Sequence, residues 1–246
     1  MSAVAISVCD DGIVVASDGV CYDYDSGNVG GYVSKVILMP EYSCFIATTG
    51  MGAFGAALRW EVNQGINSFD DFVDGFERIA KAVHTRLCFS LFGATTGPET
   101  EVSCVIGGWS DRRQAYEAYR LVSYGKQSIN GHDGASGRLE PFKAEKLPGA
   151  IWCSFTPDHM AEFGLAPPPS DMETAEILAR MISACRADSG YSDDRYANVG
   201  GFLQMTVVQR DHIQSWVSHR WREDEIGRPI DPSKGLRIAP WQLQAA

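Results

Sequence analysis

Short stretches in which apolar residues alternate with small or polar ones open the chain and predict β-strands. Residues 4–8 show this alternation, Asp11-Gly12 supplies a tight turn, and residues 13–16 resume the apolar run. A strand, a tight turn and a second strand are typical of a β-hairpin. Residues 35–48 predict a second hairpin, and the Gly-, Tyr- and Asp-rich residues 18–32 between the two hairpins are expected to form a loop.

The pattern then changes to the helical period. A first helix is expected over residues 52–63, and a second begins at Ser68, where Asp71 acts as the capping-box partner. Apolar residues recur on one face of this second helix as far as Leu87. A third helix is expected to begin at Ser170.

Further strands are predicted in the second half of the chain, over residues 101–124, 151–155 and 202–217. The order of four strands, two helices, two or three strands, one helix and a hairpin favours antiparallel sheets covered by helices, the α+β class. We expect one domain over residues 1–221, followed by a charged, Pro-containing C-terminal extension over residues 222–246.

Composition and charge narrow the classes of function. The 246 residues are 45% hydrophobic and 21% charged, as in globular proteins. The formal net charge of −10 disfavours nucleic acid and anionic membrane surfaces as partners, because both attract basic proteins. The N-terminus lacks a basic segment, and no apolar run approaches the ~20 residues of a membrane span. We therefore expect a cytoplasmic protein.

The spacing of cysteine and histidine predicts neither a disulfide framework nor a metal site. The seven cysteines contain no C-x-x-C pair, and several lie in apolar strand-like runs, where a free thiol behaves as a small hydrophobe. The five histidines show no H-x-x-x-H or H-E-x-x-H arrangement. We expect free thiols, a reducing compartment and no metal.

A glycine motif raises the alternative of a nucleotide-binding dehydrogenase. Residues 50–55 spell G-x-G-x-x-G between a strand and a helix. A dinucleotide site also needs a βαβ unit with an acidic residue at the end of the next strand. Here the next element is a second helix, and the candidate acids Asp70 and Asp71 lie in its first turn. We interpret the glycines as a turn that lets a helix pack closely on a sheet, and expect no cofactor.

Ser2 is the first catalytic candidate. Removal of Met1, which is usual before a small residue, would make Ser2 the N-terminal residue. Its free α-amine, with an ordinary pKa of about 7.7–8.0, could then take the hydroxyl proton while the oxygen attacks a carbonyl. A nearby lysine would keep that amine neutral by like-charge repulsion. If Met1 stays attached, the same nitrogen is an amide without basicity and this mechanism cannot run.

Four short motifs follow one another along the chain. The first motif, residues 2–18, runs from Ser2 to an aspartate at the end of the first hairpin. The second hairpin begins with Ser34-Lys35-Val36-Ile37 and ends with Ile46-Ala47-Thr48-Thr49-Gly50. The fourth motif, residues 182–189, closes the third helix with an Asp-Ser pair. In this order and spacing they resemble the proteasome β-subunit family, including its bacterial HslV-like and Anbu-like relatives. The resemblance covers roughly residues 2–220.

The resemblance implies a fold and a set of roles. The fold would be a four-layer αββα sandwich of antiparallel sheets, as in N-terminal-nucleophile (Ntn) hydrolases. Ser2 would be the nucleophile, with its own amine as the base, and Asp18 and Lys35 would tune that amine. A backbone N–H at Thr48 would stabilise the oxyanion, and Asp188-Ser189 would support the amine.

The chain also departs from the family. Serine stands in place of the threonine nucleophile, and Thr48 in place of the glycine of the oxyanion hole. Ser154-Phe155-Thr156-Pro157 replaces the family's Gly-Ser-Gly, so this motif does not place the family's serine in the chain. Residues 191–199 lengthen the connection after the Asp-Ser pair.

The sequence leaves two functions open. The first is an amide hydrolase, a peptidase that acts on peptide or protein substrates, with copies of the chain assembled into a ring or stack and an unfoldase as a conceivable further partner. The second is a catalytically inactive subunit of the same fold with a structural role in an assembly, because a fold does not fix a function.

Overall fold

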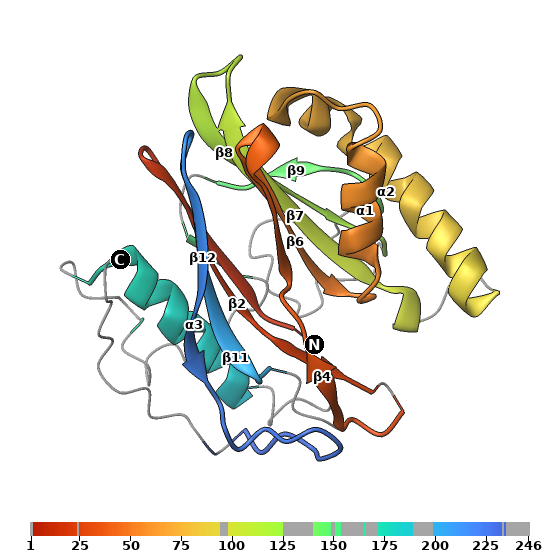
Figure 1. Cartoon of the computed structure of the whole chain (residues 1–246), viewed down its shortest axis with the longest axis vertical. Coiled ribbons are helices and arrows are strands. Elements are labelled where there is room, and N and C mark those ends of the chain that lie inside the picture. The colour runs from red at the N-terminus through yellow and green to blue at the C-terminus, as the bar shows by residue number, and fades with distance from the viewer. Residues whose placement is uncertain are drawn as a thin grey trace.

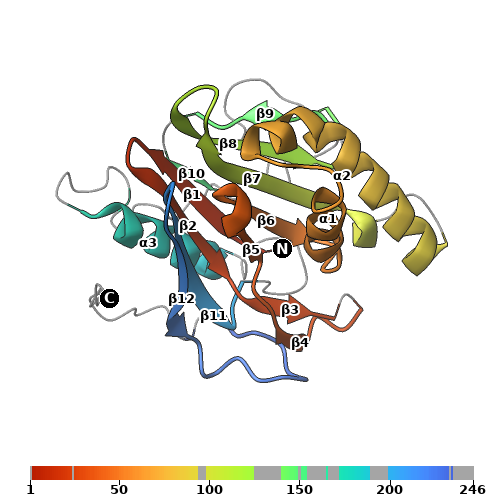
Figure 2. The same cartoon turned by 45° about the horizontal axis from the view of Figure 1, so that its top comes forward.

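The described residues form two five-stranded antiparallel sheets, a two-stranded ribbon and three α-helices (Figures 1 and 2). The structure is a computed structural model, and it describes residues 2–23, 25–93, 98–124, 140–148, 151–153, 165, 172–188, 199–232 and 234.

The first sheet has the strand order β10-β1-β2-β11-β12. Its strands are β1 (Val4–Cys9), β2 (Gly12–Asp18), β10 (Ile151–Cys153), β11 (Phe202–Val208) and β12 (Ile213–Arg220). The opening hairpin is confirmed, since Cys9 pairs with Gly12 across a two-residue turn. The last hairpin is confirmed as well, although β12 continues three residues beyond the predicted end.

The second sheet has the strand order β5-β6-β7-β8-β9. Its strands are β5 (Val36–Met39), β6 (Cys44–Gly50), β7 (Val102–Ser110), β8 (Ala115–Val122) and β9 (Glu145–Lys146), and the short 3₁₀ helix η1 (Pro40–Tyr42) joins the first two. The second predicted hairpin and the strand pair over residues 101–124 are therefore confirmed. All the neighbours in this sheet run antiparallel.

Residues 18–32 are not the plain loop that their composition predicts. They contain β3 (Val20–Tyr22) and β4 (Val29–Tyr32), which pair with each other in an antiparallel ribbon. The ribbon buries two valines, Val20 and Val29, with Ile230 from the far end of the chain. The apolar partner that makes these short runs into strands is distant in sequence, so local composition could not indicate it.

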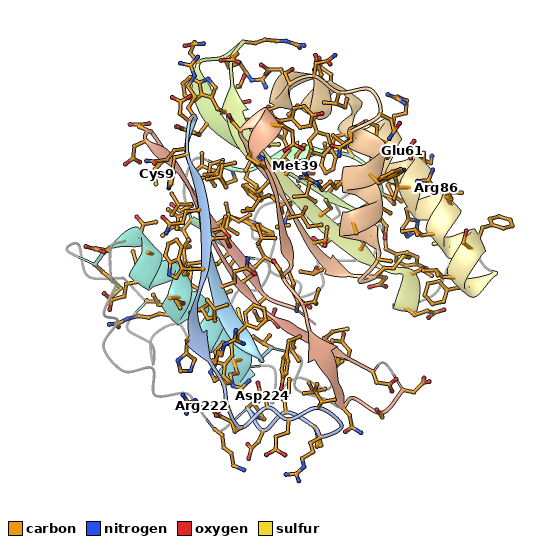
Figure 3. All side chains as sticks on the ribbon, in the orientation of Figure 1. Cys9, Met39, Glu61, Arg86, Arg222 and Asp224 are labelled. Atoms are coloured by element: carbon orange, nitrogen blue, oxygen red, sulfur yellow. The ribbon has the colours of Figure 1, made fainter. Side chains whose placement is uncertain are left out.

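Two helices cover the second sheet. They are α1 (Phe54–Val62) and α2 (Phe69–Phe92), and the 3₁₀ helix η2 (Pro98–Thr100) follows them. Ser68 caps α2, as predicted, because its Oγ accepts the N–H of Asp71 at 3.1 Å. On the outer face of the pair, Glu61 and Arg86 lie side by side in Figure 3, and their side chains form a 2.8 Å ion pair.

The third helix, α3 (Thr174–Asp188), lies on the first sheet (Figure 1). It begins four residues later than the sequence predicts, and Ser170 lies outside the described residues. Leu178 and Ile182 of α3 pack with Ala16 and Met205 of the sheet.

The faces of the two sheets that look toward each other share one apolar core. Ile6 and Val15 come from the first sheet, Phe45 and Val105 come from the second, and all four are buried in one cluster. A separate cluster packs the second sheet against α1 and α2. Alternation of side chains along each strand produces this division, because successive residues point to opposite faces.

The glycine motif over residues 50–55 has a packing role. Gly55 is buried on α1, and a Cβ at this position would lie 2.9 Å from Thr48 Oγ1 and 3.0 Å from Ile37 Cδ1. Only a residue without a side chain allows α1 to approach the sheet this closely. The preceding and following elements are antiparallel strands and a second helix, so the βαβ unit of a dinucleotide site is not formed here.

Candidate active site

Three candidate residues that are far apart in the sequence meet where the two sheets face each other near the N-terminus (Figure 2). Ser2 precedes β1, Asp18 is the last residue of β2, and Lys35 precedes β5 of the second sheet. The pairing of β1 with β2 brings the first two together, since Val4 lies opposite Ser17. Lys35 reaches them from the other sheet, so the packing of the two sheets assembles the group.

The Asp18 carboxylate is the centre of this group and is completely buried. Its Oδ1 accepts the N–H of Ala3 at 2.9 Å, and its Oδ2 accepts the N–H groups of Val20 and Gly200, each at 3.3 Å. Backbone donors from three separate segments therefore fix its orientation. A buried carboxylate needs such partners, because burial without them is strongly unfavourable.

Lys35 links Asp18 to Ser2. Its Nζ lies 2.8 Å from Oδ1 and 2.9 Å from Oδ2 of Asp18, and it donates to Ser2 Oγ at 2.6 Å. The lysine is 7% exposed, so solvent screens these contacts little. An ammonium held by a buried carboxylate is a fixed positive charge beside Ser2. It can donate to the hydroxyl, but a proton leaving Ser2 Oγ needs a different acceptor.

The expected oxyanion residue, Thr48, lies on β6 next to Lys35. Its backbone N–H donates to the Lys35 carbonyl oxygen at 3.0 Å and so belongs to the sheet. Two residues further along, Gly50 has φ = +90°, and a Cβ there would overlap the Glu101 carbonyl oxygen. The strand therefore ends in a conformation that requires glycine.

The expected Asp188-Ser189 pair is only partly visible. Asp188 is the last residue of α3, its side chain lies outside the described part of the structure, and Ser189 lies outside it altogether. The resemblance predicts their role, which stays a prediction. Arg186, two residues before Asp188, is described and is completely buried.

Sequence reasoning missed Gly200 as a contributor to this group. Its N–H binds Asp18, and its carbonyl oxygen accepts the N–H of Gly19 at 3.1 Å. The Gly200-Gly201 doublet was visible in the sequence as the end of the lengthened connection. Nothing in its local pattern indicated that it would approach Asp18, which is 182 residues away.

A second group of buried charges lies at the opposite end of the second sheet. The Glu117 carboxylate is bound by Arg113, Lys146 and Tyr119. Burial alone would raise the pKa of Glu117, but these hydrogen bonds and the Arg113 charge outweigh it and hold the pKa below its usual value. Burial and the bond to Glu117 together raise the pKa of Tyr119 to about 12. These contacts tie β8 to its neighbours and do not touch Ser2.

The residues that the structure describes offer neither a metal site nor a membrane-spanning helix. They contain no group of three or more His, Cys, Asp or Glu side chains placed to hold a metal ion. None of their helices combines the length and the apolar character that crossing a membrane requires.

Comparison with known proteins finds similarity in structure only. No protein-family model and no curated protein sequence matches the chain. The structure of Anbu (ancestral beta-subunit) from Yersinia bercovieri matches with a TM-score of 0.58 at 8% identity, over 91% of this chain and 88% of that one. Two structures of Anbu from Hyphomicrobium sp. strain MC1 match at 12% identity, over 92% of this chain and 89% of each of those chains. The TM-score is 0.56 for one of them and 0.57 for the other, which is described as a Gly-1 mutant.

The chain has an Anbu-like, proteasome-type fold. At 8% and 12% identity the similarity shows the fold alone. The antiparallel sheets and few helices described above agree with it. The resemblance that the short motifs suggested therefore agrees with the structural similarity.

Proposed function

We propose that this chain is a proteasome-like Ntn amide hydrolase, a peptidase with Ser2 as its nucleophile after removal of Met1. The observation that supports this most is the 2.6 Å hydrogen bond from Lys35 Nζ to Ser2 Oγ, with the same Nζ bound to both oxygens of buried Asp18. A fixed positive charge favours a hydroxyl oxygen that develops negative charge. The same charge disfavours protonation of a free amine nearby.

The proposed reaction is an acyl transfer in two steps. The α-amine of Ser2 takes the proton from Oγ while Oγ attacks the substrate carbonyl, and the amine then gives that proton to the leaving nitrogen. The C–N bond breaks, and an ester joins Ser2 to the acyl half of the substrate. Water, activated by the same amine, hydrolyses the ester and restores Ser2. Lys35 and Asp18 stay charged throughout, and Asp188-Ser189 would support the amine.

The oxyanion donor of this reaction would lie on the edge of β6 between Thr48 and Gly50. The N–H of Thr48 is engaged with Lys35, as described above. N–H directions alternate along a strand, and Met51 N–H points to the other neighbour, toward Glu101. The N–H of Gly50 therefore points to the same side as that of Thr48, beyond the start of β5, and is the donor we propose.

Self-assembly is the second part of the proposal. Two large apolar side chains, Trp60 of α1 and Phe89 of α2, are 66% and 67% exposed on the helices that cover the second sheet. The structural neighbours include a protein described as an ancestral beta-subunit, and a subunit belongs to an assembly. We propose a homo-oligomeric ring or stack of αββα subunits in the cytoplasm that shields the sites, with an unfoldase as a further partner.

The test is turnover of fluorogenic peptides by protein whose intact mass shows that Met1 has been removed. Wild type and Ser2→Ala are compared at equal concentration across a panel of peptides with basic, acidic and apolar residues at the cleaved bond. We expect turnover by wild type and a loss of at least about 10³-fold in Ser2→Ala, since no other group replaces the nucleophile. The turnover of Lys35→Met should fall by a comparable factor.

A matched control removes an ion pair far from the site and changes nothing at the site. Glu61→Gln removes the exposed partner of Arg86 on the outer helices and should leave turnover unchanged. Equal turnover by wild type and Ser2→Ala would contradict the proposal. No turnover by wild type lacking Met1, together with a stable oligomer, would favour the alternative, an inactive structural subunit.

A further inference from the structure

The first part of the C-terminal extension folds back on its own chain. The N–H of Val29 donates to the Arg228 carbonyl oxygen at 2.8 Å, and the N–H of Gly227 donates to the Val29 carbonyl oxygen at 2.8 Å. Ile230 is 7% exposed and packs on the β3–β4 ribbon. These contacts place the segment 221–232 beside the end of α3 and the ribbon, near the base of Figure 1.

One buried ion pair joins this segment to α3. Arg186 Nη1 and Nη2 lie 2.9 and 2.8 Å from the two carboxylate oxygens of Asp224, and both side chains are completely buried. The guanidinium also stacks on the Trp221 ring, 4.9 Å from its centroid, and donates to the Val199 carbonyl oxygen at 2.8 Å. Figure 3 labels Asp224 at this end of the molecule.

Stability alone is a weak reason to bury such a pair. Removing two charges from water is expensive, and well-packed apolar side chains of similar volume stabilise a protein equally well or better. A forked, two-point contact does offer geometric precision, because it fixes both distance and orientation. The forked contact with Arg186 therefore fixes the position of Asp224, and this precision is its distinctive property.

Asp224 holds a short piece of backbone that reaches Asp18. Its Oδ2 accepts the N–H of Gly201 at 2.7 Å. The neighbouring residue, Gly200, donates its own N–H to Asp18 Oδ2 at 3.3 Å. The donor held by Asp224 and the donor that orients Asp18 thus belong to adjacent peptide units.

Glycine is required at both positions, because this piece of backbone lies very close to neighbouring side chains. A Cβ at Gly200 would overlap Asp224 Oδ2 and Arg186 Nη1. Gly201 has φ = +75°, in the left-handed region that favours glycine, and a Cβ there would lie 2.8 Å from the Tyr32 ring. Asp224, Arg186 and the glycine doublet therefore form one tightly fitted unit.

We propose that the Arg186–Asp224 pair positions the Asp18 carboxylate, through Gly200-Gly201, and so sets the geometry of Lys35 and Ser2. The C-terminal segment is then a part of the site's scaffold within the same subunit, in addition to any contact that it makes with a neighbour. Asp224 and Arg186 are positioning residues and touch no reacting atom. The catalytic consequence rests on the proposed function, whereas the effect on Asp18 does not.

The test measures amide hydrogen exchange in Asp224→Asn and wild type. The reporters are the N–H groups of Ala3 and Val20, which donate to Asp18 and not to Asp224. Asparagine has nearly the same shape, so the change removes mainly the charge. We expect exchange at both reporters to rise by about tenfold or more, because Asp18 loses one of its fixed donors. Strand β7 should exchange as in wild type.

The matched control is Glu117→Gln, which removes an equally buried carboxylate from an ion pair in the other sheet. It should leave the reporters Ala3 and Val20 within about twofold of wild type at equal global stability. A rise in Asp224→Asn that is confined to residues 199–201 and 221–231 would overturn the proposal. Should Asp224→Asn fail to fold, Arg186→Lys, which keeps the charge but loses the fork, gives the same readout.

Turnover adds a second, separable readout. If wild type cleaves peptides, Asp224→Asn should lower kcat by about tenfold or more with little change in KM, since substrate contacts are intact. An unchanged kcat would contradict the positioning role. If wild type cleaves no peptide, the proposed function fails, while the exchange data still decide whether the pair positions Asp18.

Discussion

Lys35 Nζ lies 2.6 Å from Ser2 Oγ, although 32 residues and a change of sheet separate the two in the chain. The contact exists because Asp18, at the end of β2, holds the same Nζ with both of its carboxylate oxygens. The arrangement places one fixed positive charge between a hydroxyl and a buried carboxylate. The effect of removing this charge, and the state of the Ser2 amine beside it, can each be measured.

The buried Lys35–Asp18 pair should show strong coupling in unfolding experiments. Lys35→Met leaves the Asp18 charge buried without its partner, and we expect it to lower the free energy of unfolding by about 3–5 kcal/mol. The double variant Lys35→Met with Asp18→Asn should be less destabilised than the sum of the two single variants. Urea unfolding of all four proteins measures this; strict additivity would show that the two side chains do not interact.

The glycine at position 200 should be irreplaceable for steric reasons. Gly200→Ala places a Cβ against Asp224 and Arg186, and we expect a loss of at least about 3 kcal/mol in the free energy of unfolding. Gly52→Ala is the matched control, because nothing lies within 4 Å of a Cβ there, and its effect should stay within about 0.5 kcal/mol. Thermal unfolding compares the two, and equal melting temperatures would refute the close packing at Gly200.

Glu117 should make the protein sensitive to acid. Its pKa in the folded state is held below the usual value, so its contribution to stability is complete above about pH 4.3, the ordinary value for Glu, and is lost as pH falls through the folded-state pKa. Glu117→Gln should cost about 1–3 kcal/mol at pH 6, and its difference from wild type should shrink toward pH 3. Urea unfolding at a series of pH values measures this.

Its control is Glu225→Gln, which removes an exposed carboxylate that pairs with Arg228. This variant should follow wild type at every pH, because exposed pairs contribute little. A constant difference between Glu117→Gln and wild type from pH 6 to pH 3 would mean that Glu117 binds protons equally in both states, against the expected shift.

The two apolar side chains on the outer helices predict an effect on assembly. Trp60→Glu should shift the protein toward smaller species, because a charge would have to be buried in any contact made by this face. Light scattering after size-exclusion chromatography, at several concentrations, follows the change. Glu61→Gln, on the same helix, serves as the control. A monomeric wild type, or an unchanged oligomer in Trp60→Glu, would contradict a role of this face.

Much of the fold could be predicted because its signals are local. Apolar runs around short turns over residues 4–16 and 202–217 predicted hairpins that the structure confirms, and Ser68 with Asp71 marked a helix start that it also confirms. The β3–β4 ribbon was missed, since its buried valines depend on Ile230, about 200 residues further along. Local composition there, rich in glycine and aspartate, favours a loop.

The sequence likewise predicts some residues of the candidate site and not others. Ser2 follows from its place after a removable Met1, Asp18 and Lys35 follow from a resemblance in motif order, and the structure brings the three together. The Arg186–Asp224 pair and the Gly200 N–H were not foreseen, because ion pairs between distant segments leave no periodic signal in a single sequence. Asp188-Ser189 remains a prediction from the resemblance.

The intact mass of the purified protein shows whether Ser2 has a free α-amine, on which everything proposed for Ser2 depends. We expect a single species lighter by one methionine residue than the encoded chain, with Ser2 as the first residue in N-terminal sequencing. Met1 retained on all molecules would leave Ser2 nitrogen as an amide without basicity. That result would contradict the proposed peptidase, and it would leave Lys35, Asp18 and Ser2 as a structural contact between the two sheets.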